Sequence, residues 1–399
     1  MNERPVRPQL IVLASTYPRW KDDHEPSFVH ELARRLTSSF DVVAVVPHAP
    51  GAAVREILDG VDVVRYRYAP AAFETLVNDG GIVTNLRRAP WKWLLVPSFA
   101  MGQWLAARRL LRPGTIVHAH WLVSPGAIAR CLGAPYLLTS HGADLFALRA
   151  PLAVRLKRWV ALGARRFAVV SNAMADEAVR QLGVPEVTVS PMGADLQARF
   201  TPDLSLVRDK DHLLFVGRLV EKKGIDILLH ALPRVIAERA ATRLTIVGHG
   251  PLMAQLRALA EELGIAGAVD FAGPLAGRAL VDMYRRASLF VAPFRPATSG
   301  DQEGLGLVLV EALGCGLGVV ASDVPAARDV LAEMPGASRV VPGDADALAS
   351  EIMRRLESPS LPDAVAGRQA LLDRFDWEAV TARYRDALLA IRDASSAEP

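Results

Sequence analysis

The chain contains only two cysteines, Cys131 and Cys315, among its 399 residues. They lie far apart in the sequence and show no metal-ligand spacing, which excludes a disulfide-stapled fold and gives no sign of a zinc site. The fold must therefore be held together by an apolar core, and we expect a reducing compartment, the cytoplasm.

Long apolar runs are missing as well. No stretch reaches the roughly 18 uninterrupted apolar residues that a membrane-spanning helix needs, and the first ten residues lack the apolar centre of a secretory signal. We therefore expect a protein that is soluble in the cytoplasm or peripheral at the inner face of the cell membrane.

Several common site motifs are also absent. The chain has no GxxxxGK[ST] phosphate loop, and the GHG at 248–250 is too short to count as a dinucleotide-binding fingerprint. His118 and His120 are not accompanied by a third ligand at metal-site spacing, so we expect no metal there. No internal repeat of solenoid length is present.

What is present predicts a two-domain α/β protein. A chain of 399 residues exceeds one ordinary core, and 51% of it is hydrophobic while only 6% is aromatic. Apolar β-type runs alternate with helical patterns, which is typical of parallel sheets covered by helices on both faces. The polar stretch 200–211 is the expected linker. We predict domains at 1–199 and 200–375, and a C-terminal helix, 376–399, that packs back towards the first domain.

Charge is unevenly distributed, although the net charge is only +3. Residues 1–200 carry a net charge of +8 and residues 201–399 a net charge of −5. The segment 86–166 contains thirteen Lys and Arg residues but a single acid, Asp144. Such a basic block favours contact with an anionic surface or an anionic substrate.

Tryptophans are interleaved with this basic block. Trp91 and Trp93, together with Arg109, resemble an anchor for a membrane interface or an acceptor. A domain helix with core tryptophans and a basic outer face explains the same pattern. Pro90 and Pro97 interrupt the segment, so no single long helix is expected across it.

A histidine follows one of the apolar runs in the first half. His141 ends the expected strand 135–141, beside Gly142 and close to Asp144. Open α/β sheets hold their ligands at the carboxyl ends of strands. His141 is therefore either a group that polarises a substrate or a satisfied core histidine, and the residues alone leave both interpretations open. Earlier in this half, Ser27 is expected to cap a helix.

The second half begins with a strand that ends in a basic turn. Arg218, Lys222 and Lys223 follow Gly217, and Gly224 is expected to open a helix. Cations at such a turn can reach phosphate oxygens, Arg as a two-pronged donor and Lys as a point charge. A solvated basic turn is the alternative.

The segment 301–322, DQEGLGLVLVEALGCGLGVVAS, contains two carboxylates, Glu303 and Glu311, on either side of a glycine-containing turn. We expect the apolar run from Leu307 to form a buried helix that ends near Gly314. Glu311 lies among apolar residues, where a carboxylate is costly unless it has a partner.

The start of this expected helix is suited to an anion. Free N–H groups at Gly304 to Leu307 and the helix dipole favour a phosphate or a developing negative charge. The two flanking carboxylates can accept hydrogen bonds from hydroxyls, and a sugar nucleotide carries both kinds of group. The alternative is a capped core helix in which Glu303 is a solvated end charge.

Taken together, these motifs resemble the retaining glycosyltransferases of family four. That family has the GT-B fold, two Rossmann-like α/β domains whose parallel sheets face a central cleft. The N-terminal STYPRWKDDHEPSFVHELA resembles the branch that acts on bacterial surface polysaccharides, although it lacks the paired glycines of many relatives. SDVPAARDVL likewise departs from a common GG-x-x-E version. The matching segments, in family order, are TSHGAD, SPMGADLQARFTP, VGRLVEKKG, VGHGPL, EGLGLVLVEALGCGLGVVAS with its E-x7-E pair, and FDWE.

The resemblance implies a role for each matching residue. Arg218 and Lys223 would hold the diphosphate of a sugar nucleotide and stabilise it as it leaves. Glu311 would accept the ribose hydroxyls and Glu303 those of the donor sugar, while His141 would approach the O6 and the reacting face of the sugar. His141 and Glu303 are thus the catalytic candidates. The donor-binding candidates are Arg218, Lys223, Gly304, Leu305, Gly306, Leu307 and Glu311.

The implied reaction is retaining transfer of a hexosyl group from a UDP- or GDP-sugar to a glycan or lipid-linked glycan, in polysaccharide or glycoconjugate biosynthesis. No DxD pair stands at a donor turn and two cations can replace a metal, so we expect neither a metal nor another cofactor, and no nucleic-acid partner. A nucleotide-sugar epimerase or a phosphorylase would use the same fold. A non-catalytic sugar-nucleotide-binding protein is a third class, marked by loss of the charged site residues.

Overall fold

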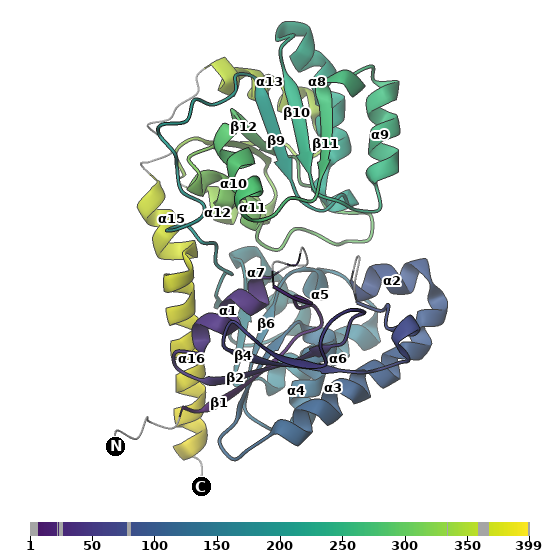
Figure 1. Cartoon of the computed structure of the whole chain (residues 1–399), viewed down its shortest axis with the longest axis vertical. Coiled ribbons are helices and arrows are strands. Elements are labelled where there is room, and N and C mark those ends of the chain that lie inside the picture. Colours follow the sequence, from purple (N-terminus) through teal and green to yellow (C-terminus); the bar gives the residue numbers. More distant parts are fainter. Residues whose placement is uncertain are drawn as a thin grey trace. The chain divides into compact units, whose positions relative to one another are not determined.

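The computed structural model describes residues 7–21, 23, 27–77, 81–332, 334–357 and 367–397. The chain forms two compact units, each built around its own sheet (Figure 1). Unit 1 comprises residues 1–170, 174–190 and 380–399, and unit 2 comprises residues 171–173 and 191–379.

Unit 1 contains an eight-stranded sheet in the order β3-β4-β2-β1-β5-β6-β7-β8. All neighbours are parallel except β3 and β4. The chain reverses its direction across the sheet between β1 and β5, which is the topological switch point where such sheets bind ligands. The strands are β1 (Gln9–Leu13), β2 (Asp41–Pro47), β3 (Arg55–Leu58), β4 (Val61–Tyr66), β5 (Ile116–His120), β6 (Tyr136–Ser140), β7 (Arg166–Val169) and β8 (Thr188–Val189).

Helices connect these strands. Proline shapes the basic segment as expected: α2 ends at Arg88, a 3₁₀ turn runs from Pro90 to Leu95, and α3 begins at Val96 with Pro97 in its first turn. No single helix therefore spans it. The helices are α1 (Phe28–Leu36), α2 (Ile82–Arg88), α3 (Val96–Leu110), α4 (Ala127–Leu132), α5 (Ala143–Phe146), α6 (Pro151–Gly163), α7 (Asn172–Leu182) and the C-terminal α16 (Trp377–Ala397), with short turns η1 (Ala71–Phe73), η2 (Pro90–Leu95) and η3 (Leu122–Gly126).

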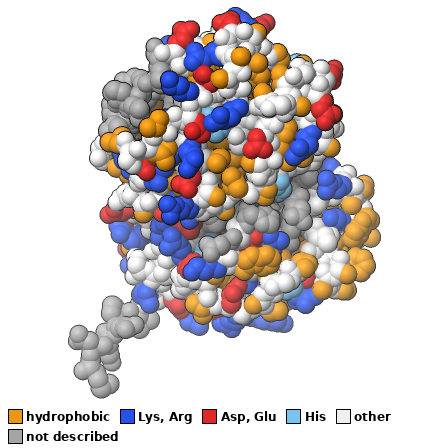
Figure 2. Space-filling view, turned by 45° about the horizontal axis from the view of Figure 1, so that its top comes forward, with side chains coloured by type: hydrophobic (Ala, Val, Ile, Leu, Met, Phe, Trp, Pro, Cys, Tyr) orange, Lys and Arg blue, Asp and Glu red, His pale blue; other side chains and the backbone are white. Residues whose placement is uncertain are grey.

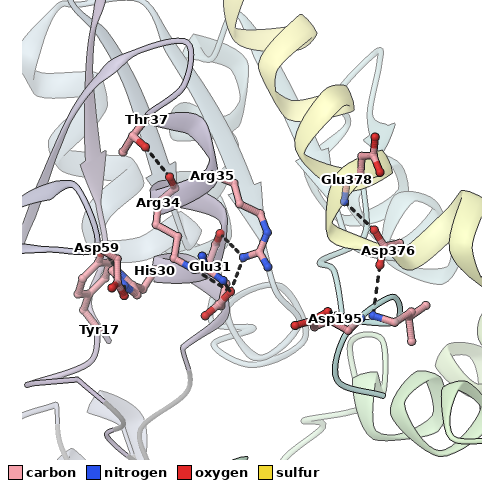
Figure 3. A network of polar contacts seen from close by, with 12 residues as sticks. Tyr17, His30, Glu31, Arg34, Arg35, Thr37, Asp59, Asp195, Asp376 and Glu378 are labelled. Atoms are coloured by element: carbon pink, nitrogen blue, oxygen red, sulfur yellow. Dashed lines mark hydrogen bonds and ion pairs between the residues drawn. The ribbon is translucent and has the colours of Figure 1, made fainter. Parts of the chain in front are cut away.

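Helix α1 is held by buried polar contacts rather than by the expected cap. Ser27 is the N-cap residue of α1, as predicted, but its side chain makes no capping hydrogen bond. Inside the helix, His30 is buried and its Nδ1 lies 2.8 Å from the hydroxyl of Tyr17. Its Nε2 lies 3.0 Å from Asp59 (Figure 3). This chain of contacts ties the helix to the loop that follows β1.

Unit 2 contains a six-stranded sheet in the order β11-β10-β9-β12-β13-β14, in which all neighbours are parallel. Its switch point lies between β9 and β12. The strands are β9 (His212–Val216), β10 (Arg243–Val247), β11 (Val269–Gly273), β12 (Leu289–Ala292), β13 (Gly318–Ser322) and β14 (Ala337–Val340). The helices are α8 (Ile225–Glu238), α9 (Met253–Glu262), α10 (Gly277–Arg286), α11 (Leu307–Gly314), α12 (Pro325–Leu331), α13 (Ala345–Glu357) and α15 (Arg368–Phe375), with short turns η4 (Glu221–Lys223) and η5 (Ala266–Ala268).

The central strands show why the sequence predicted buried sheets. Every residue of β1 (QLIVL) and of β9 (HLLFV) is buried. Parallel strands covered on both faces require such continuous apolar runs. Among the helices that the structure describes, none combines the length and the apolarity needed to cross a membrane.

The residues around 200 belong to unit 2, although the expected boundary lay at 199/200. Ala194 pairs with Asp376, and the Asp376 carboxylate accepts hydrogen bonds from the amides of Leu196 and Glu378 (Figure 3). The expected linker, 200–211, is held just as firmly. The guanidinium of Arg208 donates to four backbone carbonyls of unit 2, those of Tyr284, Arg285, Ala287 and Cys315.

Candidate active site

The candidate site in unit 2 lies at the switch point of its sheet. The loop after β9 carries Arg218 and Lys223, and the loop after β12 carries Glu303 before α11 begins at Leu307. Because β9 and β12 are adjacent parallel strands, their carboxyl ends lie at one edge of the sheet. The topology therefore brings together residues that are about 80 positions apart in the sequence.

Lys223 and Glu303 form an ion pair. Lys223 Nζ lies 2.7 Å from Glu303 Oε2 and also 4.6 Å from the centroid of the Phe294 ring. Burial alone would raise the pKa of Glu303, but Lys223 and the neighbouring Lys222 outweigh it and bring the pKa to about 2. The site thus holds one ammonium and one carboxylate that is ionised at neutral pH, neither fully exposed to solvent.

The neighbouring lysine has a different partner. Lys222 Nζ lies 3.2 Å from the carboxylate of Asp301 and donates to the carbonyl of Gln302 at 3.0 Å. Its role is to tie the turn after β9 to the loop before α11. Of the two lysines in the turn, Lys223 is the one that pairs with Glu303.

The residues from Gly304 to Leu307 form a tight turn at the start of α11. Gly304, Leu305 and Gly306 are buried, and Gly306 adopts the left-handed conformation with a φ of 80°. Glycine takes up this conformation without steric cost, which explains its position here. The amide of Gly306 donates to the carboxylate of Glu303 and helps to keep it ionised. The α11 helix runs from Leu307 to Gly314, as the sequence predicted.

Glu311 has the partner that its apolar surroundings require. The hydroxyl of Tyr284 on α10 donates to Glu311 Oε2 at 2.8 Å, and Tyr284 is fully buried. Burial raises the pKa of Glu311 to about 7, with smaller opposing contributions from Tyr284, Arg199 and Lys223. The two glutamates therefore differ: Glu303 is firmly ionised, whereas Glu311 changes charge near neutral pH.

Arg218 lies exposed in the turn after Gly217, and a second glycine-rich loop packs against that turn. A Cβ at Gly248 would come within 2.0 Å of the carbonyl oxygen of Gly217, and one at Gly250 within 2.4 Å of that of Leu219. The amide of Leu219 in turn donates to the carbonyl of His249. The GHG motif thus serves the close approach of two loops that shape the turn bearing Arg218.

Unit 1 places His141 directly after β6. The carboxylate of Asp144 accepts hydrogen bonds from the amides of His141, Gly142 and Leu122, at 3.2, 3.2 and 2.9 Å. Burial raises the pKa of Asp144, and these hydrogen bonds oppose that shift. His141 itself is partly buried, and burial lowers its pKa to about 3. It is therefore a neutral imidazole at physiological pH.

Two features of the site were not anticipated from the sequence. Tyr284 was missed, although a tyrosine on the buried side of an amphipathic helix signals a hydroxyl in need of a partner. His120 was considered only as a metal ligand, yet its Nδ1 lies 2.9 Å from Nε2 of His141. Within the part of the chain that the structure describes, no group of three or more His, Cys, Asp or Glu residues is arranged to hold a metal ion.

The tryptophans of the basic segment lie on the surface. Trp91 is 48% and Trp93 58% exposed, and Arg109 is exposed on α3. Leu94, Met101 and Leu105, also exposed, belong to the same segment. Figure 2 shows hydrophobic side chains gathered with Lys and Arg at the edge of unit 1 that carries α2 in Figure 1. Trp91 and Trp93 are thus not core residues.

Two family models match the chain. The model described as Glycosyltransferase Family 4 matches residues 27–198, and the model described as Glycosyl transferases group 1 matches residues 210–358. A GDP-mannose-dependent alpha-(1-6)-phosphatidylinositol monomannoside mannosyltransferase of Mycolicibacterium smegmatis is 31% identical over 287 residues, 68% of this chain and 75% of that protein. A glycogen synthase of Mycobacterium tuberculosis is 28% identical over 393 residues, 91% of this chain and 90% of that protein.

Solved structures share the architecture. Sucrose-phosphate synthase from Thermosynechococcus elongatus matches with a TM-score of 0.76 at 19% identity, over 97% of this chain and 100% of that chain. The Anabaena protein HepE, in complex with UDP and glucose, matches with a TM-score of 0.72 at 18% identity, over 96% and 100% of the two chains. At such identities the similarity shows the fold alone, and that fold is GT-B.

Proposed function

The chain belongs to the glycosyltransferases of family 4, and we propose that it moves a hexosyl group from a UDP- or GDP-sugar to a glycan or lipid-linked glycan acceptor. The transfer would retain the anomeric configuration and would need no metal ion. Unit 2 would bind the donor and unit 1 the acceptor. The observation that carries the proposal is the group formed by Lys223, Glu303 and Glu311 at the switch point of unit 2.

The chemistry of this group suits a departing diphosphate. When the bond from the anomeric carbon to the phosphate oxygen breaks, the nucleoside diphosphate gains negative charge. Lys223, Arg218 and the N–H groups at the start of α11 would stabilise that charge, which lowers the barrier. Two cations would thereby do the work of a metal ion.

Retention follows from attack on the face that the diphosphate leaves. The acceptor oxygen would bond to the anomeric carbon while its proton passes to a phosphate oxygen of the leaving group, so no covalent enzyme intermediate is required. Glu311 would accept the ribose hydroxyls and Glu303 hydroxyls of the sugar. In unit 1, His141, neutral at physiological pH, is the candidate for contact with a sugar hydroxyl.

GDP-mannose is the first donor to test, because the mycobacterial relative uses it by name. Purified protein would be incubated with GDP-mannose, UDP-glucose or ADP-glucose, with and without a phosphatidylinositol mannoside acceptor. If the protein transfers sugar, free nucleoside diphosphate should appear only when the acceptor is present. NMR should then show an α-linked product. An epimerase would convert the sugar nucleotide without acceptor, a phosphorylase would require phosphate, and a binding protein would release nothing.

The affinity for the nucleotide should increase with pH through about 7. An ionised carboxylate accepts hydroxyl hydrogen bonds with both oxygens and more strongly than the neutral acid, and burial raises the pKa of Glu311 to about 7. About one unit below that pKa only about a tenth of Glu311 is ionised, so binding of GDP or UDP at pH 6 should be up to about tenfold weaker than at pH 8. Isothermal titration calorimetry at both values measures this. Glu311→Gln corrects for ionisation of the nucleotide itself, and an equal pH dependence in this variant would refute the assignment.

We further propose that the Trp91–Trp93 surface contacts an anionic membrane, which keeps the protein peripheral at the inner face of the cell membrane and brings it to a lipid-linked acceptor. Exposed tryptophans beside basic residues suit the interface, where indole rings sit at the headgroups and cations meet anionic lipids. The exposed aromatic surface and the basic bias of this segment support this proposal.

Vesicle flotation tests the membrane contact. Wild-type protein should float with vesicles containing phosphatidylglycerol and not with pure phosphatidylcholine, and Trp91→Ala/Trp93→Ala/Arg109→Ala should remain in the soluble fraction. A control variant, Leu204→Ala/Val207→Ala/Arg278→Ala, removes two apolar side chains and one arginine that are even more exposed, in unit 2, and should float as the wild type does. Unchanged flotation of the Trp91→Ala/Trp93→Ala/Arg109→Ala variant would contradict the proposed membrane contact.

A further inference from the structure

Three histidines form a row at the carboxyl ends of β5 and β6 in unit 1. His118 and His120, two residues apart on β5, point to the same face of the sheet, and their ring centroids are 4.0 Å apart. His141 follows β6, and its ring is nearly parallel to that of His120, at an interplanar angle of 11°. Nδ1 of His120 and Nε2 of His141 are hydrogen-bonded at 2.9 Å.

This bond determines which nitrogen of His141 is available to a ligand. A neutral imidazole has one N–H donor and one lone-pair acceptor. Since Nε2 of His141 is engaged by His120, Nδ1 is the nitrogen left to meet a substrate. If His120 accepts, His141 holds its proton on Nε2 and can only accept at Nδ1; if His120 donates, the reverse holds. The inner histidine thus sets the hydrogen-bonding character of the outer one.

His120 is itself well fixed. It is buried, with an exposed fraction of 1%, and packs against His118, whose Nε2 lies 2.9 Å from the hydroxyl of Thr139. Burial lowers the pKa of His118 to about 3 and that of His120 well below its usual value, so neither carries charge near pH 7. The row is therefore a set of neutral rings in contact with one another and not a cationic patch.

Aromatic rings hold His141 from its other sides. The ring centroid of Phe28 lies 4.9 Å away and that of Trp121 5.1 Å away. The peptide at His141 is fixed by Asp144 through two backbone amides. With the backbone fixed and the ring flanked, the bond to His120 is the polar contact that selects the orientation of the imidazole plane.

We propose that His120 is a positioning residue for sugar transfer: through Nδ1 it orients His141 and fixes the tautomer with which His141 meets a sugar hydroxyl. This inference rests on the proposed function for the identity of the ligand. The geometry of the pair stands independently of it, and the experiments below separate the two.

The kinetic test compares three substitutions of His120. Asparagine carries its amide where the histidine has Nδ1 and can keep the bond to His141, whereas glutamine carries its amide where the histidine has Nε2, and phenylalanine removes the bond. His120→Phe and His120→Gln should lower kcat about tenfold, the size expected for one neutral hydrogen bond, with little change in KM for the donor. His120→Asn should retain most of the wild-type kcat. Melting curves verify that each variant is folded.

A structural role alone would not distinguish asparagine from glutamine, nor would it alter the tautomer of His141. Long-range ¹H–¹⁵N spectra of the histidine side chains should show one tautomer of His141 in the wild type and in His120→Asn, and a mixture in His120→Phe. An unchanged tautomer in His120→Phe, or equal kcat losses in the Asn and Gln variants, would overturn the inference. If the wild type transfers sugar from no donor, the proposed function fails while the spectra still test the histidine pair.

Discussion

Replacement of Lys223 by alanine is expected to lower the turnover number for sugar transfer at least about a hundredfold while the protein remains folded. The variant removes the ammonium that we assign to the leaving diphosphate. It also leaves the carboxylate of Glu303, whose side chain is only 15% exposed, without its partner at 2.7 Å. Loss of one such preorganised contact costs on the order of 2.7 to 4 kcal/mol in the transition state. Steady-state transfer at saturating donor measures the effect, with circular dichroism as the test of folding.

Lys222 supplies the matched control. It precedes Lys223 in the chain and bears the same charge, but its ammonium pairs with Asp301 at 3.2 Å. Lys222→Ala removes an equal charge from the same turn and should lower turnover by less than about tenfold, as expected for loss of a partly exposed ion pair. Equal losses in the two variants would show that only the net charge of the turn matters. Near-normal turnover in Lys223→Ala would contradict the site assignment.

Glu311→Ala should also lower turnover at least about a hundredfold, because the ribose would lose its acceptor and the buried hydroxyl of Tyr284 would lose its partner at 2.8 Å. Glu311→Gln separates the two effects. Glutamine keeps the size and can accept from Tyr284 through its amide oxygen, so only the charge is removed. Binding of GDP or UDP by calorimetry, together with transfer rates, distinguishes weaker donor binding from slower chemistry.

The outcomes of this comparison are distinct. A loss in Glu311→Ala that Glu311→Gln fully restores would mean that packing on Tyr284, and not a charged acceptor, is what the site requires. Similar losses in both variants are the result expected here. Tyr284→Phe, which removes the orienting hydroxyl alone, should have a smaller effect than either, since Glu311 itself remains.

Much of the fold was accessible from the sequence because buried parallel strands are continuous apolar runs. Strand β13 has the predicted bounds, Gly318–Ser322, and α11 begins at Leu307 as expected. The antiparallel strand β3 was missed even though its signal is present. Asp59 and Gly60 form a two-residue turn with φ values of 46° and 87°, the conformation that Asp-Gly favours in hairpins.

The segment 200–211, which we expected to be a linker, shows that a polar composition does not by itself predict a loosely held segment. The segment 200–211 is polar and contains Pro202, yet Arg208 within it donates to four carbonyls of unit 2. A single arginine with five donors can fix a polar segment, and no local pattern reveals where its acceptors will lie. The same limit applies to Ser27, whose capping bond is absent although its sequence position suited one.

The candidate site likewise contains some contacts that the sequence could indicate and others that it could not. The ion pair of Lys223 and Glu303 follows from two loops at adjacent strand ends, so it could be anticipated once the order of the strands was assumed. The contacts of Tyr284 with Glu311 and of His120 with His141 depend on tertiary packing between elements far apart in the sequence. A buried polar residue signals that a partner exists, but the sequence does not identify the partner.

Thermal unfolding in the presence of sugar nucleotides measures whether unit 2 binds a nucleotide-diphosphate sugar through Lys223 and Glu311. Wild-type protein and the Lys223→Ala and Glu311→Ala variants would be melted with GDP-mannose, UDP-glucose and ADP-glucose. A ligand at a hundred times its Kd stabilises the folded protein by about 2.7 kcal/mol. At least one of these donors is expected to raise the Tm of the wild type by several degrees and to raise that of neither variant. No shift with any donor, or equal shifts in all three proteins, would contradict this assignment.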